Sequence, residues 1–277
     1  MRVDAHQHFW RYDPAEYDWI GEGMERLARD YLPADLAPLL TAEGIAGSVA
    51  VQARQTIEET RWLLGLAAKH PAILGVVGWV DLRSSEVGEQ LREFAANPRF
   101  VGVRHVVQNE PDVRFLLGEA FVVGLQQLHG FGLTYDLLLY PPQLPAAVEL
   151  AGMTPEQPFV LDHLAKPLIK PGTLDPWQAD LRALARHPNV SCKLSGLVTE
   201  AAWQGWKRAD FAPYLEVALE AFGPKRLMLG SDWPVCLLAA EYPDVVGIVT
   251  EFIARLSDSE QALILGGTAS RFYGLTR

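Results

Sequence analysis

The chain has 277 residues, 49% of them hydrophobic, and a formal net charge of −10. This length and composition indicate a folded protein with a large core, built as one α/β barrel or as two small domains, and exclude a disordered chain. The acidic balance, with no Lys/Arg block longer than a pair, argues against a nucleic-acid surface and against attraction to anionic membranes.

The N-terminus and the cysteines indicate a cytoplasmic protein. The chain starts with Met1-Arg2-Val3-Asp4 and has no apolar leader, nor any run of about 18 apolar residues. The two cysteines, Cys192 and Cys236, have no CxxC spacing, so we expect reduced core thiols without a nucleophilic role.

Short apolar runs alternate with helical patterns along the whole chain, which predicts βα units and a parallel sheet. The predicted strands cover residues 2–8, 47–53, 72–80, 100–107, 132–139, 158–163, 189–194 and 226–231. The predicted helices cover residues 58–69, 86–95, 114–129, 143–151, 176–187, 211–222, 244–256 and 258–265.

Helix ends are marked by the repeated pairs His70-Pro71, Asn97-Pro98, His187-Pro188 and Gly223-Pro224. No linker divides the chain, and the strands are apolar on both faces, as in a covered parallel sheet. We therefore predict a single (β/α)8 TIM-barrel domain over residues 1–277. An open doubly wound sheet is the alternative, but no Gly-rich phosphate loop follows any strand.

Residues 10–33 fit no βα unit and are rich in aromatic and charged side chains. Because this segment follows the first strand directly, it is expected as a loop over the barrel mouth, where active sites of this fold lie.

Polar side chains stand at the end of every predicted strand, where a barrel brings them into one mouth. They are His6, His8, Gln52, Arg54, Trp79, Asp81, Arg104, His105, Tyr135, Asp136, Asp162, His163, Lys193, Ser195, Ser231 and Asp232. His6 and His8 are two residues apart, so both leave the same strand face. With Asp232, and with His163 completing the set, they form a candidate metal site. The structural alternative is a pair of hydrogen-bonded core histidines.

Three stretches carry a resemblance to a known family. They are Val3-Asp4-Ala5-His6-Gln7-His8-Phe9-Trp10, Leu161-Asp162-His163-Leu164-Ala165-Lys166-Pro167 and Leu229-Gly230-Ser231-Asp232-Trp233-Pro234. Together, and in this order, they resemble the amidohydrolase superfamily, and more narrowly its lactonase branch. The resemblance spans nearly the whole chain. It implies hydrolysis of a sugar-acid lactone, such as fuconolactone or rhamnonolactone, or of pyrone dicarboxylate lactone, in carbohydrate catabolism.

The departures from that family limit the metal site. Binuclear members carry a bridging lysine or glutamate at the end of strand four, where this chain has Arg104-His105, and many carry a histidine on strand five, where it has Tyr135-Asp136. The resemblance thus implies at most one metal ion, held by His6, His8, His163 and Asp232. One Zn²⁺ ion is compatible with it, and so is catalysis without a metal.

The expected mechanism is attack by water, with Asp232 as general base and His6, His8 and His163 polarising the lactone carbonyl. The expected partner is a small sugar lactone, with no nucleic acid and no membrane, while oligomeric state is left open. The predicted substrate-binding residues are Gln52, Arg54, Trp79, Arg104, Asp136, Lys193 and Trp233.

Several of these residues have structural alternatives. Arg104 and Lys193 are alternatively ion-pair partners of Asp136, and Trp79 and Trp233 alternatively fill the core. Asp81 is expected as a loop cap, Asp162 to face away beside His163, and His105 to alternate away from Arg104.

Two rival functions remain at this point. Related barrels with a similar His-x-His pair and strand-eight aspartate are metal-dependent decarboxylases of aromatic acids. A non-catalytic sugar-binding barrel is the other alternative.

Overall fold

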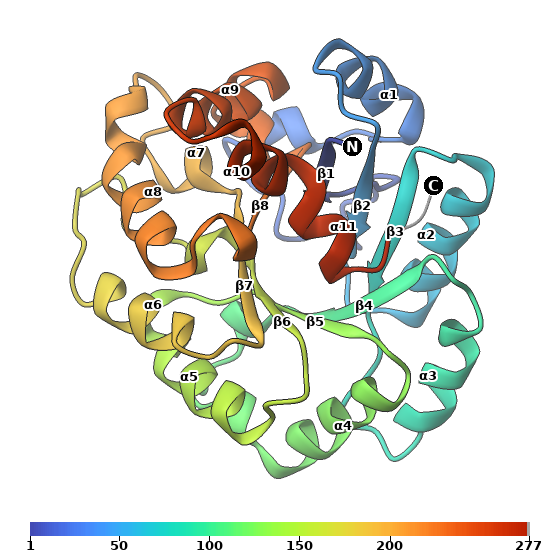
Figure 1. Ribbon diagram of the computed structural model, residues 1–277. Helices are drawn as coiled ribbons and strands as arrows, with labels where there is room; N and C mark the ends of the chain where they lie inside the picture. Colours follow the sequence, from blue (N-terminus) through green and yellow to red (C-terminus); the bar gives the residue numbers. More distant parts are fainter. Residues whose placement is uncertain (276–277) are drawn as a thin grey trace.

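The eight predicted strands form one parallel sheet, ordered β1 to β8 in chain order. The computed structural model describes residues 1–275, and Figure 1 shows the strands surrounded by helices. The strands are β1 (Val3–Gln7), β2 (Gly47–Val51), β3 (Ile73–Gly78), β4 (Phe100–His105), β5 (Thr134–Leu137), β6 (Phe159–Leu161), β7 (Val190–Leu194) and β8 (Leu227–Leu229).

The ends of β1 and β8 come together and bring the sheet to a nearly closed barrel. The Asp232 amide donates to the His6 carbonyl at 2.8 Å, and the His8 amide donates to the Trp233 carbonyl at 2.7 Å. The (β/α)8 prediction is confirmed, and the open doubly wound alternative is wrong. Within residues 1–275, no helix is both long and apolar enough to cross a membrane.

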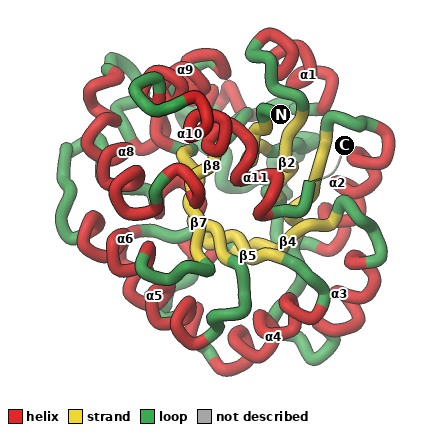
Figure 2. Tube along the Cα trace, in the orientation of Figure 1, coloured by secondary structure: helices red, strands yellow, loops and turns green. Residues whose placement is uncertain are grey.

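Helices follow the strands and cover the outside of the barrel (Figure 2). They are α1 (Pro33–Ala42), α2 (Ile57–Lys69), α3 (Val87–Ala95), α4 (Glu119–Gly130), α5 (Leu144–Met153), α6 (Trp177–Ala185), α7 (Leu197–Glu200), α8 (Arg208–Phe222), α9 (Tyr242–Ile253), α10 (Asp258–Ala262) and α11 (Thr268–Phe272). The helix predicted from residue 114 begins later, because Phe115–Leu117 forms a 3-10 turn before Gly118.

Helix α1 has no counterpart among the predicted helices. Pro33 occupies its first turn, and the Asp35 carboxylate accepts from the Leu32 amide at 2.9 Å, which caps the helix. Pro38 within the helix hides this start in the sequence pattern.

Residues 268–273 close the lower end of the barrel, where the strands begin. Ala269 and Tyr273 pack against the apolar barrel interior, which includes Val3, Val49 and Met228. Figure 1 shows α11 across the centre of the sheet. Tyr273, which follows α11, is thereby buried inside the barrel.

Residues 10–33 lie at the opposite end, beside the ends of β1, β2 and β8. Trp10 and Tyr31 form an antiparallel bridge that holds the base of this loop. Arg26 donates to the Leu237 carbonyl at 3.0 Å on one side, and the Tyr17 hydroxyl donates to Glu59 at 3.5 Å on the other. The loop is therefore anchored along the rim of the barrel mouth.

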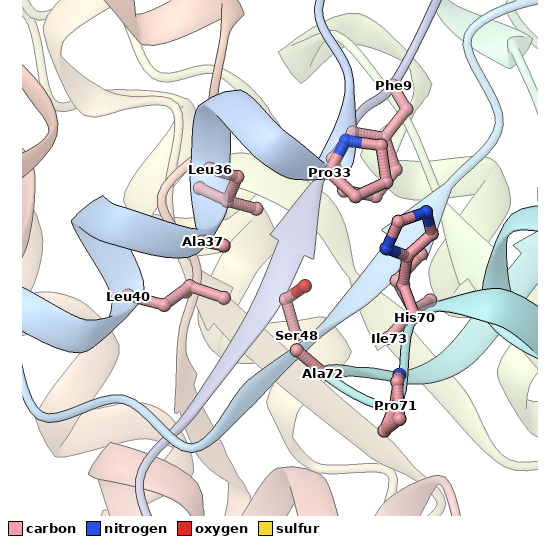
Figure 3. Close-up of a pocket in the computed structure, with 10 residues that line it drawn as sticks. All are labelled: Phe9, Pro33, Leu36, Ala37, Leu40, Ser48, His70, Pro71, Ala72 and Ile73. Atoms are coloured by element: carbon pink, nitrogen blue, oxygen red, sulfur yellow. The ribbon is translucent and has the colours of Figure 1, made fainter.

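A small apolar cavity of about 120 Å³ lies outside the barrel, between α1, β2 and the turn from α2 to β3 (Figure 3). Leu36 and Leu40 line it from α1, Pro71 lines it from the turn, and Ile73 lines it from the start of β3. None of the predicted site residues contacts this cavity.

Candidate active site

Three side chains from the two ends of the sheet meet in the barrel mouth. The Nε2 atoms of His6 and His8 lie 3.2 Å apart. Asp232 Oδ1 lies 3.8 Å from His6 Nε2 and 3.4 Å from His8 Nε2. His163 approaches the same carboxylate oxygen, with its Nε2 at 3.9 Å. The four residues predicted to act together are thus adjacent, and all are buried.

His8 is held in one tautomer by the neighbouring strand. Its Nδ1 lies 2.8 Å from the Val51 carbonyl at the end of β2. Because a carbonyl only accepts, Nδ1 of His8 donates to it, and in the neutral ring Nε2 then presents a lone pair to the mouth.

His163 reaches the mouth through an unusual turn after β6. Residues 163–166 all have left-handed backbone angles, with φ between 51° and 57°. The ring packs against Gly196, where a Cβ would lie 2.6 Å from His163 Cγ and where φ is +64°. Only glycine suits this position, because both the backbone angle and the ring exclude a side chain. His163 Nδ1 contacts Ser195 Oγ at 2.9 Å.

Asp232 is held by a second hydrogen-bonded group at the junction of β1 and β8. The buried Asp4 carboxylate accepts from the Ser231 amide at 2.9 Å, the Ser231 hydroxyl at 2.6 Å and the Tyr242 hydroxyl at 3.1 Å. Asp232 itself has φ 58°, so its backbone conformation is one that non-glycine residues adopt only when their surroundings enforce it.

A buried network of charges lies beneath the histidines. Lys193 Nζ lies 2.5 Å from Asp136 Oδ2 and 2.9 Å from Asp162 Oδ1. Arg104 donates to Asp162 Oδ2 at 3.0 Å, and the Tyr273 hydroxyl donates to Asp136 Oδ2 at 2.8 Å. Two cations and two carboxylates therefore compensate one another inside the barrel.

The network contacts His6 directly. His6 Nδ1 lies 3.0 Å from Lys193 Nζ and 3.3 Å from Asp162 Oδ1. The expectation that Asp162 faces away from the site is wrong. The alternative of ion pairing is confirmed for Lys193 with Asp136, whereas Arg104 pairs with Asp162.

Burial and these neighbours shift the pKa values of the site. Burial lowers the pKa of His163 to about 4 and that of His6 well below its ordinary value, so both rings are neutral near pH 7. Burial alone would raise the pKa of Asp232, but the nearby His163 and His8 outweigh it and hold that pKa below its ordinary value. Asp232 is therefore a carboxylate.

The two network carboxylates shift in opposite directions. Burial raises the pKa of Asp136 to about 6, against the opposing charge of Lys193. Burial also disfavours ionised Asp162, but Lys193, His6 and Arg104 together lower its pKa. Asp162 faces two cations and Asp136 faces one, which explains the difference.

The remaining predicted residues lie around this centre. Gln52 is buried, and its Oε1 accepts from Arg104 at 3.0 Å. Arg54 sits on the rim between Glu16 at 2.5 Å and Glu59 at 3.9 Å. Trp233 is buried against Phe9 and Tyr31 in the adjoining loop.

Trp79 and His105 point to the outside of β4. Trp79 Nε1 lies 3.3 Å from His105 Nδ1, and His105 stacks on Phe115 and contacts Glu110 at 2.7 Å. The alternation of His105 away from Arg104 is confirmed. Asp81 accepts from the Arg83 amide at 3.0 Å, which confirms it as a loop cap.

Sequence reasoning missed other polar residues near the mouth. Lys166 Nζ lies 4.0 Å from Glu200 and 5.4 Å from the centre of the Tyr140 ring. Burial lowers the pKa of Lys166 and raises that of Glu200. Lys166 belongs to the motif around His163, but it lies three residues past the end of the predicted strand. Strand alternation does not predict the direction of a side chain there. Glu59 accepts from the Arg54 amide at 2.7 Å. It lies within a predicted helix, so the sequence pattern does not place it near the mouth.

The donor set fits one divalent cation. His6, His8 and Asp232 each offer one ligand atom, and these atoms lie within 4.8 Å of one another; His6, Asp162 and His163 form an overlapping group. Two imidazoles and a carboxylate suit zinc. The lone pair of His8 Nε2, enforced by Val51, is already directed into the group.

The cysteines take no part in this centre. Cys192 and Cys236 are both free and buried, and burial raises both thiol pKa values. The prediction of reduced core thiols is confirmed.

A parallel barrel that gathers a His-x-His pair, a histidine after strand six and an aspartate after strand eight has the architecture of an amidohydrolase-type enzyme. The chain belongs to the amidohydrolase family, whose model matches residues 3–275.

Characterised relatives match over the full length. An L-fucono-1,5-lactonase from Burkholderia multivorans is 46% identical over 286 residues, covering 99% of this chain and 96% of that protein. An L-fucono-1,5-lactonase from Burkholderia ambifaria is 36% identical, covering 100% and 97%. A crystal structure of an amidohydrolase from Burkholderia multivorans with bound zinc has 45% identity and a TM-score of 0.95, covering 100% of both chains.

Proposed function

We propose that this protein hydrolyses the ester of a sugar-acid lactone of the L-fucono-1,5-lactone type. The enzyme is an ester hydrolase that opens lactones, as its 46% identity to a curated lactonase supports. The observation that carries the mechanism is Asp232 Oδ1, a buried carboxylate oxygen within 3.9 Å of three histidine nitrogens. These relatives also favour lactone hydrolysis over the decarboxylase and the sugar-binding alternatives.

We assign Asp232 as the general base. Because its pKa is held low, it is ionised across the working range and accepts a proton from water as the water oxygen attacks the carbonyl carbon. The tetrahedral intermediate then collapses by breaking the bond to the ring oxygen, and the alkoxide takes the proton back from Asp232. The product is the open hydroxy acid.

His163 is assigned to the carbonyl oxygen. When the Ser195 hydroxyl donates to Nδ1 across 2.9 Å, Nε2 of the neutral ring carries the N–H and points into the mouth. An N–H donor placed where negative charge develops stabilises the transition state. A divalent cation held by His6, His8 and Asp232 would add Lewis-acid polarisation of the same carbonyl.

The other predicted residues divide by position. We assign Arg54, on the rim, to substrate hydroxyls or a carboxylate. Gln52, Arg104, Asp136 and Lys193 are buried and paired with one another, so we propose that they support the histidines from below and shape the floor of the site. Trp79 and Trp233 have protein partners that favour a packing role.

The experiment compares Asp232→Asn with the wild type on L-fucono-1,5-lactone, followed by proton release with a pH indicator. Loss of a general base predicts a fall in kcat of about 10²- to 10⁴-fold. Asp81→Asn is the matched control, because it makes the same change in a rim loop outside the site. If Asp232→Asn keeps activity within about tenfold of the control, the assignment of the base is refuted. If the wild type opens no aldonolactone, the function itself is refuted.

A further inference from the structure

We propose that Lys193 and Asp162 compete for Nδ1 of His6, and that the outcome decides whether His6 presents an N–H or a free lone pair at Nε2. The inference rests on the proposed role of His6 in the mouth. It assigns both buried residues as positioning residues that control how readily the site accepts a divalent cation.

Lys193 favours a lone pair at Nδ1. Its ammonium group is fully buried and has three N–H donors and no acceptor. Asp136 Oδ2 at 2.5 Å, Asp162 Oδ1 at 2.9 Å and His6 Nδ1 at 3.0 Å surround it. A hydrogen bond from Lys193 to Nδ1 requires the ring proton to sit at Nε2.

Asp162 favours the opposite tautomer. Its Oδ1 lies 3.3 Å from the same Nδ1, and a carboxylate only accepts. Among the described residues, this oxygen has no hydrogen-bond partner of good geometry, although it lies in ion-pair contact with Lys193. It is therefore available to accept an N–H from His6, and that bond frees the lone pair of Nε2.

The consequence appears on the other side of the ring. His6 Nε2 faces the lone pair of His8 Nε2 at 3.2 Å, an Arg104 N–H donor at 3.4 Å and Asp232 Oδ1 at 3.8 Å. With the proton on Nε2, His6 donates to the lone pair of His8 Nε2, and the Arg104 N–H at 3.4 Å has no acceptor on His6. With the proton on Nδ1, two lone pairs and a carboxylate oxygen converge beside the Arg104 N–H, and a divalent cation satisfies all three. The ring is neutral in both tautomers.

Hydrogen-bond geometry ranks the two arrangements. Lys193 makes a well-formed hydrogen bond to Nδ1 at 3.0 Å. The contacts that favour the other tautomer are weaker, because Asp162 is poorly directed toward Nδ1 at 3.3 Å and the Arg104 N–H lies 3.4 Å from Nε2. We therefore expect the proton on Nε2 in the metal-free protein. Zinc binding then moves the ring proton to Nδ1, where Asp162 accepts it, and Lys193 keeps its two carboxylate partners.

The first test needs no substitution. Full-length protein is stripped with a chelator, and the ring nitrogens of His6 are followed by ¹⁵N NMR before and after zinc is added. The expected result is an Nε2–H tautomer without zinc and an Nδ1–H tautomer with it. A metal-free His6 already protonated at Nδ1 would overturn the proposal.

The second test measures zinc affinity in competition with a chromophoric chelator. Asp162→Asn removes the anionic acceptor and is expected to weaken zinc binding by about 10- to 100-fold. Lys193→Met removes the competing donor and is expected to tighten it by about tenfold. Tyr135→Phe is the control, because Tyr135 is buried beside Asp136 and its hydroxyl has no hydrogen-bond partner within residues 1–275.

Charge alone predicts the same two affinity changes, so the metal-free tautomer is measured in each variant. Asp162→Asn should keep the proton on Nε2, and Lys193→Met should move it to Nδ1. The same tautomer in both variants, or weaker zinc binding in both, refutes the competition. If Lys193→Met does not fold, Asp162→Asn and the wild-type titration still decide the question. Because neither readout is lactone hydrolysis, the inference and the proposed function can fail separately.

Discussion

Replacing Tyr273 with phenylalanine tests whether the Tyr273 hydroxyl stabilises the buried charged network that includes Asp136 and Lys193. The Tyr273 hydroxyl donates to Asp136 Oδ2 at 2.8 Å, the same oxygen that Lys193 contacts. Both partners of this hydrogen bond are buried. The substitution removes one hydroxyl and leaves the ring that closes the lower end of the barrel.

The expected loss follows from the charge and burial of the acceptor. A hydrogen bond to a charged group contributes about 1.5 to 3 kcal/mol. Burial already raises the pKa of Asp136 to about 6, so loss of a donor further disfavours the ionised form that pairs with Lys193. Tyr135→Phe removes a buried hydroxyl that has no hydrogen-bond partner among the described residues, and it should leave stability unchanged or raise it.

The assay is urea unfolding of both variants and the wild type at pH 7. Tyr273→Phe should lower the free energy of unfolding by about 1.5 to 3 kcal/mol relative to Tyr135→Phe, which corresponds to roughly 3 to 10 °C in Tm. A difference below about 0.5 kcal/mol, the size of an ordinary surface substitution, would show that the hydrogen bond to Asp136 does not stabilise the fold.

Three further substitutions probe the supports of the site. Gly196→Ala places a methyl group 2.6 Å from His163 Cγ at a φ of +64°. The substitution should displace the His163 ring and lower kcat by at least about tenfold. Unchanged kinetics would contradict this close packing. Asp4→Asn replaces a carboxylate that accepts from four donors at 2.6 to 3.1 Å. It should lower the free energy of unfolding in urea by about 2 to 4 kcal/mol, whereas a loss below about 1 kcal/mol would not fit these hydrogen bonds. Burial raises the pKa of Glu59 to about 7, so the folded state binds its proton more tightly than the unfolded chain. The free energy of unfolding should therefore fall by about 2 to 3 kcal/mol between about pH 4.5 and 7. Glu59→Gln should flatten this pH dependence, and an unaltered pH dependence would assign it to other groups.

The barrel could be predicted from the sequence because each βα unit is a local pattern. A buried parallel strand is an apolar run, and the proline after four of the predicted helices marks where the next strand begins. Strand ends could be predicted for the same reason, and with them His6, His8 and Asp232. Helix α1 was not predicted from the sequence, because Pro38 interrupts its helical pattern.

The direction of Asp162 could not be predicted, because it depends on where β6 ends. Val160 points into the barrel interior, so strand alternation places Asp162 inward and His163 outward. The left-handed turn at residues 163–166 then rotates His163 back to the mouth, and both side chains reach the site. Tyr273 could not be placed either, because it enters the network through α11, far from any strand end.

The left-handed turn itself offers a final prediction. Within residues 1–275, the non-glycine residues with positive φ are His163, Leu164, Ala165, Lys166 and Asp232. Each belongs to the turn after β6 or the end of β8, so strained backbone is confined to the segments that carry His163 and Asp232.

Ala165 measures that strain, because it is buried at φ 57° and has only a methyl side chain. Glycine removes a left-handed penalty of about 1 to 2 kcal/mol but loses about 0.5 to 1 kcal/mol in backbone entropy and about 0.8 kcal/mol of methyl burial. Ala165→Gly should therefore stay within about 1 kcal/mol of the wild type. Ala185→Gly, at a buried position in α6, has the same losses without that relief and should cost about 1 to 2 kcal/mol more. Equal costs in urea unfolding would mean that the surrounding barrel holds the turn without strain, and that His163 is positioned by its contacts with Gly196 and Ser195.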